Sequence, residues 1–493
     1  MFTYEKPEAM GVKSENIRKY VEILDDAELS THNIIIAKGD KIIYENYYAP
    51  FNKNFLHRMY SVTKSFVAIA VGFLVQEGKI SLDDKIVDLF PKDITDGAND
   101  NMKKQTVRNM LMMSTGFPAE NGNWFIRRAK DRVKDYFSNS EGYSKIPGSF
   151  FEYDSHGSFV LGAMVERISG MELTEYLRSR LFDKIGVSKE AYCLKCPGGY
   201  AWGDSALMCT ATDLLKVAKF TMNLGNWEGE QILSSEYLTD ATSNLIPTHW
   251  NSERPSQYGY GYLIWKQQQD SFFFNGMGCQ FAVCVPHKDM ILIYNGDNQG
   301  EPAAKSIIID TFFNLIVNDA QEKSLPDNKD EYDKLMSISK DAKLMYCKGN
   351  TFSPTADKIN EKTYILDKNI MGIEDIKFTF DKDSGIMSYT NAQGHKELPF
   401  GLGKNVFEKF PQGGYSDMCG SERLPDHYYD CAVSAGWLTD SVLYINVQII
   451  DKYFGRLHMY FSFVDDNTIC IRMNKIAEDF LDEYNGKARG YLN

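Results

Sequence analysis

The clearest hydrophobic pattern in this chain has the period of an α-helix. Apolar residues recur at helical spacing from Phe66 to Phe73, and Gly78 follows as a helix-ending residue. The pattern predicts a buried helix over residues 61–77 whose first turn carries Ser61. Similar patterns predict further helices, at residues 158–168, 173–181, 211–223 and 303–318.

Runs of β-branched and aromatic residues predict strands on both sides of these helices. Residues 33–48 read as a hairpin that turns at residues 38–40. Three more strands are predicted before the last helix, at residues 272–276, 280–286 and 290–296. Beyond a polar stretch at residues 321–334 the pattern changes to strands, at residues 376–390, 442–450 and 457–473, with a short helix near 477–484.

This change of pattern predicts two domains. Residues 1–325 read as an α/β domain of the α+β kind, and residues 326–493 read as a mainly-β domain. The polar stretch is the best candidate for a linker between them, because it lacks an apolar period. The pattern assigns no role to the second domain.

Composition narrows the classes of partner. The 493 residues are 43% hydrophobic and carry a formal net charge of −13, which repels phosphate backbones and anionic membranes. We therefore expect neither nucleic acid nor a membrane as a partner. The N-terminal residues lack the features of a secretory signal, the longest apolar run is residues 66–75, and the nine cysteines form no dense framework. These features favour a cytoplasmic protein and set no oligomeric state.

Ser61 and Lys64 form the first candidate for chemistry. Residues three apart on a helix share one face, so the pattern places an amine beside a hydroxyl. A serine needs a neighbour that takes its proton, and a lysine held in its neutral form can do so. The same spacing recurs at Ser337 and Lys340, where a capping serine and a solvated lysine explain it. The first pair differs because a long apolar helix follows it and would bury the lysine.

Two later segments carry residues suited to the same chemistry. Tyr153, in Tyr153-Asp154-Ser155, lies 92 residues beyond Ser61, and a tyrosine beside a lysine can ionise and move a proton. Taken alone, it is one of 29 tyrosines, most of which serve packing. Residues 274–280 place glycines between two strands, where an N–H can face an oxyanion. Taken alone, that second pattern is better explained by a simple glycine bulge.

Together these segments resemble the β-lactamase-related serine hydrolases. That superfamily includes class C β-lactamases, D,D-peptidases, family VIII esterases and 6-aminohexanoate-dimer hydrolases. The resemblance spans residues 5–318 and rests on several short sequence segments, which occur in the same order along the chain as in the family. Besides residues 61–64, they are PEAMGVKSENI (7–17), TVRNMLMMSTGF (106–117), FEYDSHGSFVLGAMVERISG (151–170), SALMCTATDLLKVAKF (205–220), YGYGYLIW (258–265), GMGCQFAVCVP (276–286) and MILIYNG (290–296).

The resemblance implies a fold and a set of roles. The fold is an antiparallel sheet flanked by helices, with a helical subdomain and the site between them. Ser61 matches the nucleophile, Lys64 its partner and Tyr153 the general acid and base. The N–H groups of Ser61 and Met277 would form the oxyanion hole, and no metal or cofactor is implied. The activity implied is hydrolysis of a small ester, amide or short peptide through an acyl-enzyme.

Two departures from the family pattern refine this expectation. Ser155 stands where the family usually has asparagine, and it reaches less far toward Lys64 or a substrate. Asn275 and Gly276 stand where the family has Lys-Thr-Gly or His-Thr-Gly, so the strand carries no cation for a substrate carboxylate. We therefore expect an esterase or amidase rather than an efficient β-lactamase, with Ser155, Asn275, Gly276 and Met277 at the substrate.

Three alternatives stay open. Asp154, Ser155 and His156 could be read as a triad, but adjacent residues point in different directions and no Gly-x-Ser-x-Gly elbow surrounds them. Cys193 and Cys196 form a Cys-x-x-Cys pair without a second ligand pair, which favours two loop cysteines over zinc. The third alternative is a non-catalytic ligand-binding or sensor protein on the same scaffold.

Overall fold

The computed structural model describes residues 2–94, 98–117, 129–138, 144–420 and 422–493. The chain folds as two compact units. The first unit comprises Met1–Lys343 with Met418–Gly420, and the second comprises Leu344–Asp417 with Ser421–Asn493. In the described part of the chain, none of the helices has both the length and the apolar character needed to cross a bilayer.

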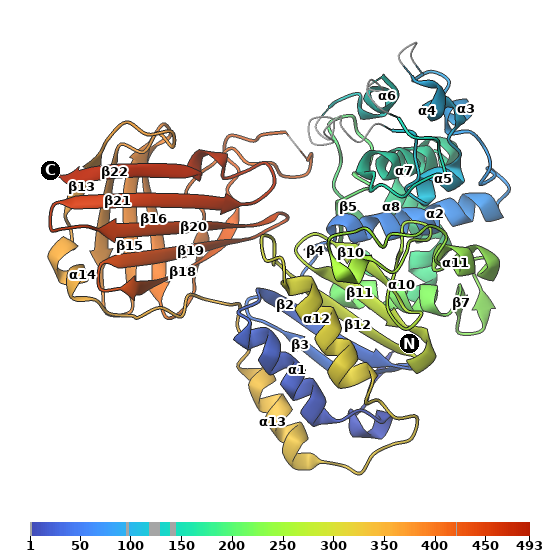
Figure 1. Cartoon of the computed structure of the whole chain (residues 1–493), viewed down its shortest axis with the longest axis horizontal. Coiled ribbons are helices and arrows are strands. Elements are labelled where there is room, and N and C mark those ends of the chain that lie inside the picture. Colours follow the sequence, from blue (N-terminus) through green and yellow to red (C-terminus); the bar gives the residue numbers. More distant parts are fainter. Residues whose placement is uncertain (1, 95–97, 118–128, 139–143, 421) are drawn as a thin grey trace. The chain divides into compact units, whose positions relative to one another are not determined.

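A seven-stranded sheet forms the base of the first unit, with the order β1-β3-β2-β12-β11-β10-β9 (Figure 1). All neighbouring strands are antiparallel except β1 and β3. The strands are β1 (Thr3–Tyr4), β2 (Thr31–Lys38), β3 (Lys41–Tyr47), β9 (Trp265–Lys266), β10 (Phe272–Gly276), β11 (Gln280–Val285) and β12 (Met290–Gly296). Strands β2, β11 and β12 are buried on both faces, which explains the apolar runs at their centres.

Helices flank this sheet, as the family resemblance implies. Helix α10 (Ala211–Met222) packs on β2, β11 and β12, and a capping box at Thr210 and Asp213 starts it. Helices α1 (Ser14–Asp26) and α12 (Ala304–Thr311) lie in front of the sheet in Figure 1 and pack with the π-helical segment η7 (Phe312–Val317). The expected antiparallel sheet flanked by helices is confirmed.

A helical subdomain is inserted between β3 and β9. Helix α7 (Ser155–Ser169) is its centre and packs on α2 (Thr63–Gln76), α5, α6 and α8. The other helices are α3 (Ile86–Leu89), α4 (Asp100–Lys104), α5 (Val107–Leu111), α6 (Arg132–Ser138), α8 (Leu173–Leu177), α9 (Asp183–Ile185) and α11 (Ser235–Ala241). Two small sheets accompany them, one of β4 (His57–Arg58), β6 (Leu207–Cys209) and β5 (Tyr192–Cys193), the other of β7 (Asn226–Trp227) and β8 (Glu230–Gln231).

The polar stretch after this unit leads into a helix. Asn328 caps α13 (Lys329–Lys340), which packs along α1, where Arg18 pairs with Glu331 at 3.0 Å. The second Ser-x-x-Lys spacing lies at the end of this helix, and neither of its two residues lines the cleft described below. The first compact unit therefore runs to Lys343, and the division into residues 1–325 and 326–493 stays a prediction.

The second unit is a closed β-barrel. Its ten strands follow the order β16-β15-β14-β13-β22-β21-β20-β19-β18-β17, and an added pairing of β16 with β18 closes the sheet. Aromatic side chains of Phe378, Phe461, Phe463 and Trp437 pack together inside it. The strands are β13 (Thr363–Leu366), β14 (Asp375–Phe380), β15 (Ser384–Asn391), β16 (Gly394–Leu402), β17 (Val406–Lys409), β18 (Asp430–Thr439), β19 (Val442–Ile450), β20 (Phe454–Phe463), β21 (Thr468–Ile476) and β22 (Gly486–Leu492). Helix α14 (Pro354–Ile359) precedes them, and the expected mainly-β C-terminal domain is confirmed.

Candidate active site

The segment that carries Ser61 has an unusual backbone. Ser61 lies in a 3₁₀ turn, η2 (Tyr60–Val62), that leads directly into α2. The residue before it, Tyr60, has a φ of 44°, a left-handed conformation that costs energy for a side chain with a Cβ. The Arg58 guanidinium lies 4.4 Å from the centre of the Tyr60 ring and holds it in place. Strain of this kind concentrates at functional sites, because the surroundings must enforce it.

Hydrogen bonds to β6 fix the same segment on both sides of the serine. The Met59 N–H donates to the Leu207 carbonyl at 2.8 Å, and the Leu207 N–H donates to Thr63 Oγ1 at 3.0 Å. Arg58 Nε donates to the Ser205 carbonyl at 3.2 Å. Ser61 therefore sits on a short turn with anchors two residues away in each direction, which makes its position well defined.

Lys64 contacts Ser61 as the helical spacing predicts. Its ammonium nitrogen lies 2.9 Å from Ser61 Oγ and 2.5 Å from the main-chain oxygen of Asp204. The side chain is 1% exposed, because α2 is buried on nearly all sides. The same nitrogen lies 5.1 Å from the centre of the Tyr153 ring. Burial disfavours a charged amine, so this setting suits a lysine that exchanges a proton with the serine.

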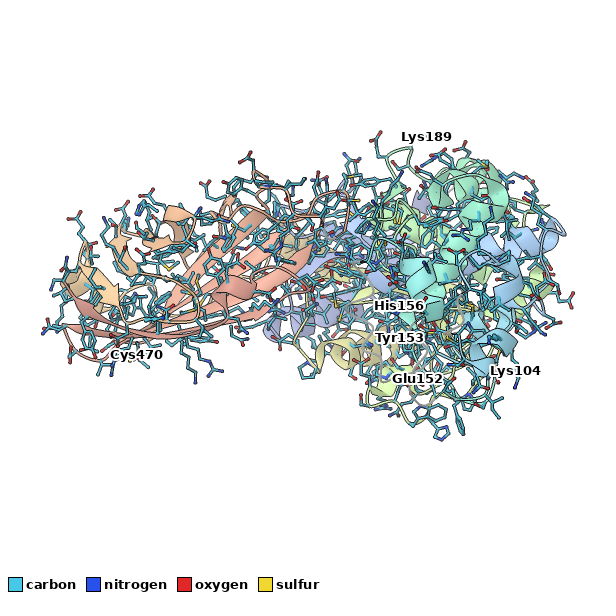
Figure 2. All side chains as sticks on the ribbon, turned by 90° about the horizontal axis from the view of Figure 1, so that it is seen from above. Lys104, Glu152, Tyr153, His156, Lys189 and Cys470 are labelled. Carbon is cyan, nitrogen blue, oxygen red and sulfur yellow. The ribbon has the colours of Figure 1, made fainter. Side chains whose placement is uncertain are left out.

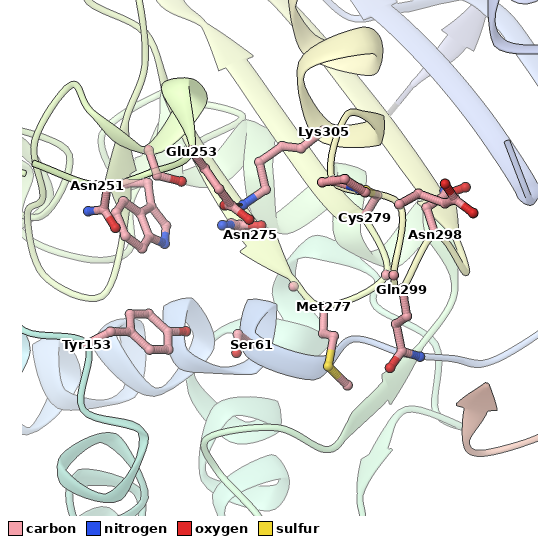
Figure 3. A pocket seen from close by; sticks show the side chains of 17 residues that line it. Ser61, Tyr153, Asn251, Glu253, Asn275, Met277, Cys279, Asn298, Gln299 and Lys305 are labelled. Atoms are coloured by element: carbon pink, nitrogen blue, oxygen red, sulfur yellow. Dashed lines mark hydrogen bonds and ion pairs between the residues drawn. The ribbon is translucent and has the colours of Figure 1, made fainter. Parts of the chain in front are cut away.

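Tyr153 completes the group from the other side of Ser61. It precedes the N-terminus of α7 and lies between Glu152 and His156 in Figure 2. Its ring stacks on Trp265 with centroids 5.9 Å apart and an angle of 17° between the planes. Its hydroxyl points toward Ser61 (Figure 3), and 37% of the side chain is exposed. The arrangement places a phenol at the wall of the same cleft that Ser61 lines.

These residues line one cleft of about 630 Å³ (Figure 3). Ser61 and Tyr153 form one wall, and Asn275, Gly276 and Met277 at the end of β10 form the opposite wall. The remaining lining comes from the last residue of η5 (Arg254–Ser256) and the loop before it, from Trp265, from Gly278 and Cys279, and from residues 298–305. The structure thus brings together Ser61, Lys64, Tyr153, Asn275, Gly276 and Met277.

Gly276 lets the two walls approach. A Cβ atom built at this position would lie 2.5 Å from the Met59 carbonyl oxygen, closer than a Cβ atom can come. A glycine is therefore needed at the point where β10 touches the segment that carries Ser61. The next residue, Met277, starts the turn back to β11 and lines the cleft on the wall opposite Ser61.

Ser155 is not among the residues that line the cleft. It is the first residue of α7 and is 5% exposed, so a contact with substrate stays a prediction. Its neighbour Asp154 caps α7 by accepting from the Gly157 N–H at 2.9 Å, and Thr115 Oγ1 donates to it at 2.9 Å. Burial raises the pKa of the Asp154 carboxyl, and these hydrogen bonds lower it again in part. Asp154 thus has a structural role, which argues against the reading of residues 154–156 as a triad.

The cleft contains a cation that sequence reasoning missed. Lys305, at the start of α12, reaches into the cleft toward Asn275 and pairs with Glu253, which lies just before η5 (Figure 3). The lysine side chain is 15% exposed, and that of the glutamate is 55% exposed. No sequence signal joins these two residues, because they are 52 positions apart and meet only through the fold.

Cys193 and Cys196 are both buried. Burial raises the pKa of the Cys193 thiol, and it raises that of Cys196 to about 12. The Arg132 guanidinium donates to Cys196 Sγ at 3.4 Å. The two thiols are therefore held in their neutral form, as small packing residues are.

Comparisons with known proteins agree with this geometry. The family model "Beta-lactamase" matches residues 16–307, which is more than half of the chain. The 6-aminohexanoate-dimer hydrolase of Paenarthrobacter ureafaciens is 25% identical over 228 residues, covering 43% of this chain and 57% of that protein. A penicillin-binding protein of Bacillus subtilis is 22% identical over 294 residues, covering 51% of this chain and 63% of that protein. The alignments thus span about three fifths of the length of these two relatives.

A solved structure shows the same fold. The D-amino acid amidase of Ochrobactrum anthropi superposes with a TM-score of 0.50 at 19% identity, over 63% of this chain and all of that one (100%). At this identity the likeness concerns the fold. One assignment follows from the match of the family model. The shared sheet and the contact of Lys64 with Ser61 agree with it. The chain belongs to the Beta-lactamase family.

Proposed function

We propose that this protein is a serine hydrolase that acts through an acyl-enzyme on Ser61. The observation that carries the proposal is the 2.9 Å contact between Lys64 Nζ and Ser61 Oγ at the wall of a cleft that Tyr153 also lines. Members of the Beta-lactamase family are serine hydrolases that act on amides, esters and peptides. The residues present in this chain supply each group that such a reaction needs.

The proposed reaction has two halves. Ser61 Oγ attacks the carbonyl carbon of the substrate while its proton passes to Lys64 or Tyr153, and the N–H groups of Ser61 and Met277 stabilise the oxyanion. Tyr153 then gives a proton to the leaving group as the bond to the carbonyl carbon breaks. Water attacks the resulting ester, its proton passes through the same two residues to Ser61 Oγ as the bond between that oxygen and the carbonyl carbon breaks, and the acid is released.

We propose small esters, amides or short peptides as substrates, with esters and amides favoured over β-lactams. The strand that faces Ser61 carries Asn275 and no cation, and Lys305 in the same cleft is already paired with Glu253. A substrate carboxylate would have to displace that glutamate before it could bind the lysine. A neutral acyl group has no such cost.

The test is intact-mass analysis after exposure to a fluorophosphonate, for the wild type and Ser61→Ala side by side. Turnover of p-nitrophenyl acetate and of nitrocefin is recorded on the same samples. We expect a single adduct that disappears in Ser61→Ala, and ester turnover well above nitrocefin turnover. Absence of both adduct and turnover in the wild type would instead favour a non-catalytic ligand-binding or sensor protein.

A further inference from the structure

Lys64 has a second hydrogen-bond acceptor that fixes its direction. Besides Ser61 Oγ, its nitrogen donates to the main-chain oxygen of Asp204 at 2.5 Å. Asp204 lies in the segment between β5 and β6, and the side chain of Lys64 reaches it from the first turn of α2. Two acceptors on different elements hold the nitrogen at one point, so the position of Asp204 determines how Lys64 faces the serine.

The side chain of Asp204 is itself held by a buried ion pair. Arg132, the first residue of α6, donates from Nη1 to Asp204 Oδ1 at 2.9 Å, and the two side chains are 2% and 0% exposed. The guanidinium carbon also lies 4.0 Å from the centre of the Phe159 ring on α7. Burial lowers the pKa of Arg132, but its interactions with Asp204 and Cys196 together raise it by more, so the arginine stays charged. Neither residue lines the cleft.

We propose that Arg132 and Asp204 are positioning residues of the hydrolase: Arg132 locks Asp204, and the Asp204 carbonyl aims Lys64 at Ser61. The proposal rests on the proposed function of the same site. It gives one residue two tasks, since Asp204 binds Arg132 through its side chain and Lys64 through its main chain. It also connects α6, which carries no residue of the cleft, to the proton path.

The pair has a second effect, through charge. The opposite charges of Arg132 and Asp204 compensate each other in a buried place. The Lys64 nitrogen lies close to it, because it contacts the main chain of Asp204. Asp204→Asn keeps the shape and the carbonyl but leaves the arginine uncompensated. An added buried cation disfavours a proton on the neighbouring Lys64–Tyr153 pair, so the acidic limb of kcat/KM should move about one unit to lower pH. The double variant Arg132→Met with Asp204→Asn removes both charges and should return the limb to its wild-type position.

Arg132→Met alone tests the positional part. We expect kcat to fall by about 10–100-fold with KM nearly unchanged, since a small displacement of a catalytic group costs about this much. Arg132→Lys, which keeps the charge, should recover most of the rate. The matched control is Arg167→Met: Arg167 belongs to the same subdomain, pairs with Asp93 and lies over the Phe90 ring, but the pair does not touch Lys64. Its acidic limb should stay within about 0.2 units of the wild type.

The experiment uses the full chain, p-nitrophenyl acetate as substrate, and thermal unfolding of every variant. A limb that moves down in Asp204→Asn and returns in the double variant supports the proposal, because loss of stability alone does not shift a pKa in one direction and back. Two results would overturn the proposal: an acidic limb of kcat/KM that does not move in Asp204→Asn, or a rate loss in Arg132→Met no larger than that in Arg167→Met. Failure of the proposed function would show differently, as absence of turnover and of fluorophosphonate labelling in the wild type.

Discussion

Gly276→Ala offers a sharp test of how the cleft is built. The added Cβ would lie 2.5 Å from the Met59 carbonyl oxygen, 3.1 Å from the Cβ of Gln280 and 3.3 Å from Val62 Cγ2. The first distance is about half an ångström shorter than the closest approach that Cβ atoms make, about 3.0 Å. Main-chain atoms cannot rotate away, so β10 and the segment before Ser61 must move apart by at least that amount.

The expected cost falls mainly on catalysis. Overpacking of this size destabilises a protein by about 1–3 kcal/mol. The displacement lies between Ser61 and Met277, the two proposed donors to the oxyanion, and a misplacement of about 1 Å can cost about 100-fold in rate. We therefore expect kcat/KM for p-nitrophenyl acetate to fall by at least about 10-fold, beyond what partial unfolding explains.

The assay compares steady-state rates and thermal unfolding of the wild type, Gly276→Ala and Gly162→Ala. Gly162 is the matched control, because a Cβ there meets its nearest atom at 3.5 Å, an ordinary contact, and because alanine favours the helix that holds it. Wild-type activity in Gly276→Ala, or an equal loss in Gly162→Ala, would refute the reasoning that the close contact sets the oxyanion geometry.

Three further predictions follow from the site and its surroundings. Lys64→Ala and Tyr153→Phe should each lower kcat by about 10²–10⁴-fold while thermal unfolding stays near that of the wild type, and near-normal rates in either variant would contradict the proton path. Because Glu253 already pairs with Lys305, Glu253→Gln should lower KM for a substrate with a carboxylate near the scissile bond and leave KM for its methyl ester unchanged; equal effects on both would mean that this ion pair does not oppose carboxylate binding. Burial lowers the pKa of His57 to about 3, against about 6.5 in an unfolded chain. Below pH 6.5 the unfolded state therefore binds a proton that the folded state does not, and stability should fall by up to about 1.4 kcal/mol per pH unit between pH 6 and 4. Urea unfolding at several pH values should show that the free energy of unfolding depends less on pH in His57→Asn than in the wild type. An unchanged pH dependence would contradict the assignment to His57.

Much of the fold could be read from the sequence where burial is uniform. The runs at residues 272–276, 280–286 and 290–296 match β10, β11 and β12 almost residue for residue, because strands buried on both faces are continuously apolar. The contact of Ser61 with Lys64 follows from helical spacing alone. The short helix near residues 477–484 was placed less well, since the structure has a single 3₁₀ turn there, Asp482–Tyr484, and a left-handed Leu481 precedes it.

The parts of the site that the sequence hid depend on contacts between distant segments. Lys64 donates to the main-chain carbonyl of Asp204. Every residue has such a carbonyl, so the residue type at position 204 could not reveal this contact. Lys305 reaches the cleft because α12 folds back across the sheet, and its charge is paired with a glutamate from another loop. The polar stretch at residues 321–334 read as a linker because α13 shows only one narrow face to α1.

The strand order of the first unit also dictates when the cleft around Ser61 can be completed during synthesis of the chain. Strand β2 pairs with β3 on one edge, but its other edge waits for β12, whose sequence is made some 250 residues later. Until then Ser61 and Lys64 exist without the facing wall, since β10 joins the sheet only through β11 and β12. A nascent chain that ends before residue 290 therefore exposes an apolar strand edge, the kind that promotes aggregation. The long sequence separation of this pairing makes it a slow step of folding, and the proposed hydrolytic centre is assembled only once that step is complete.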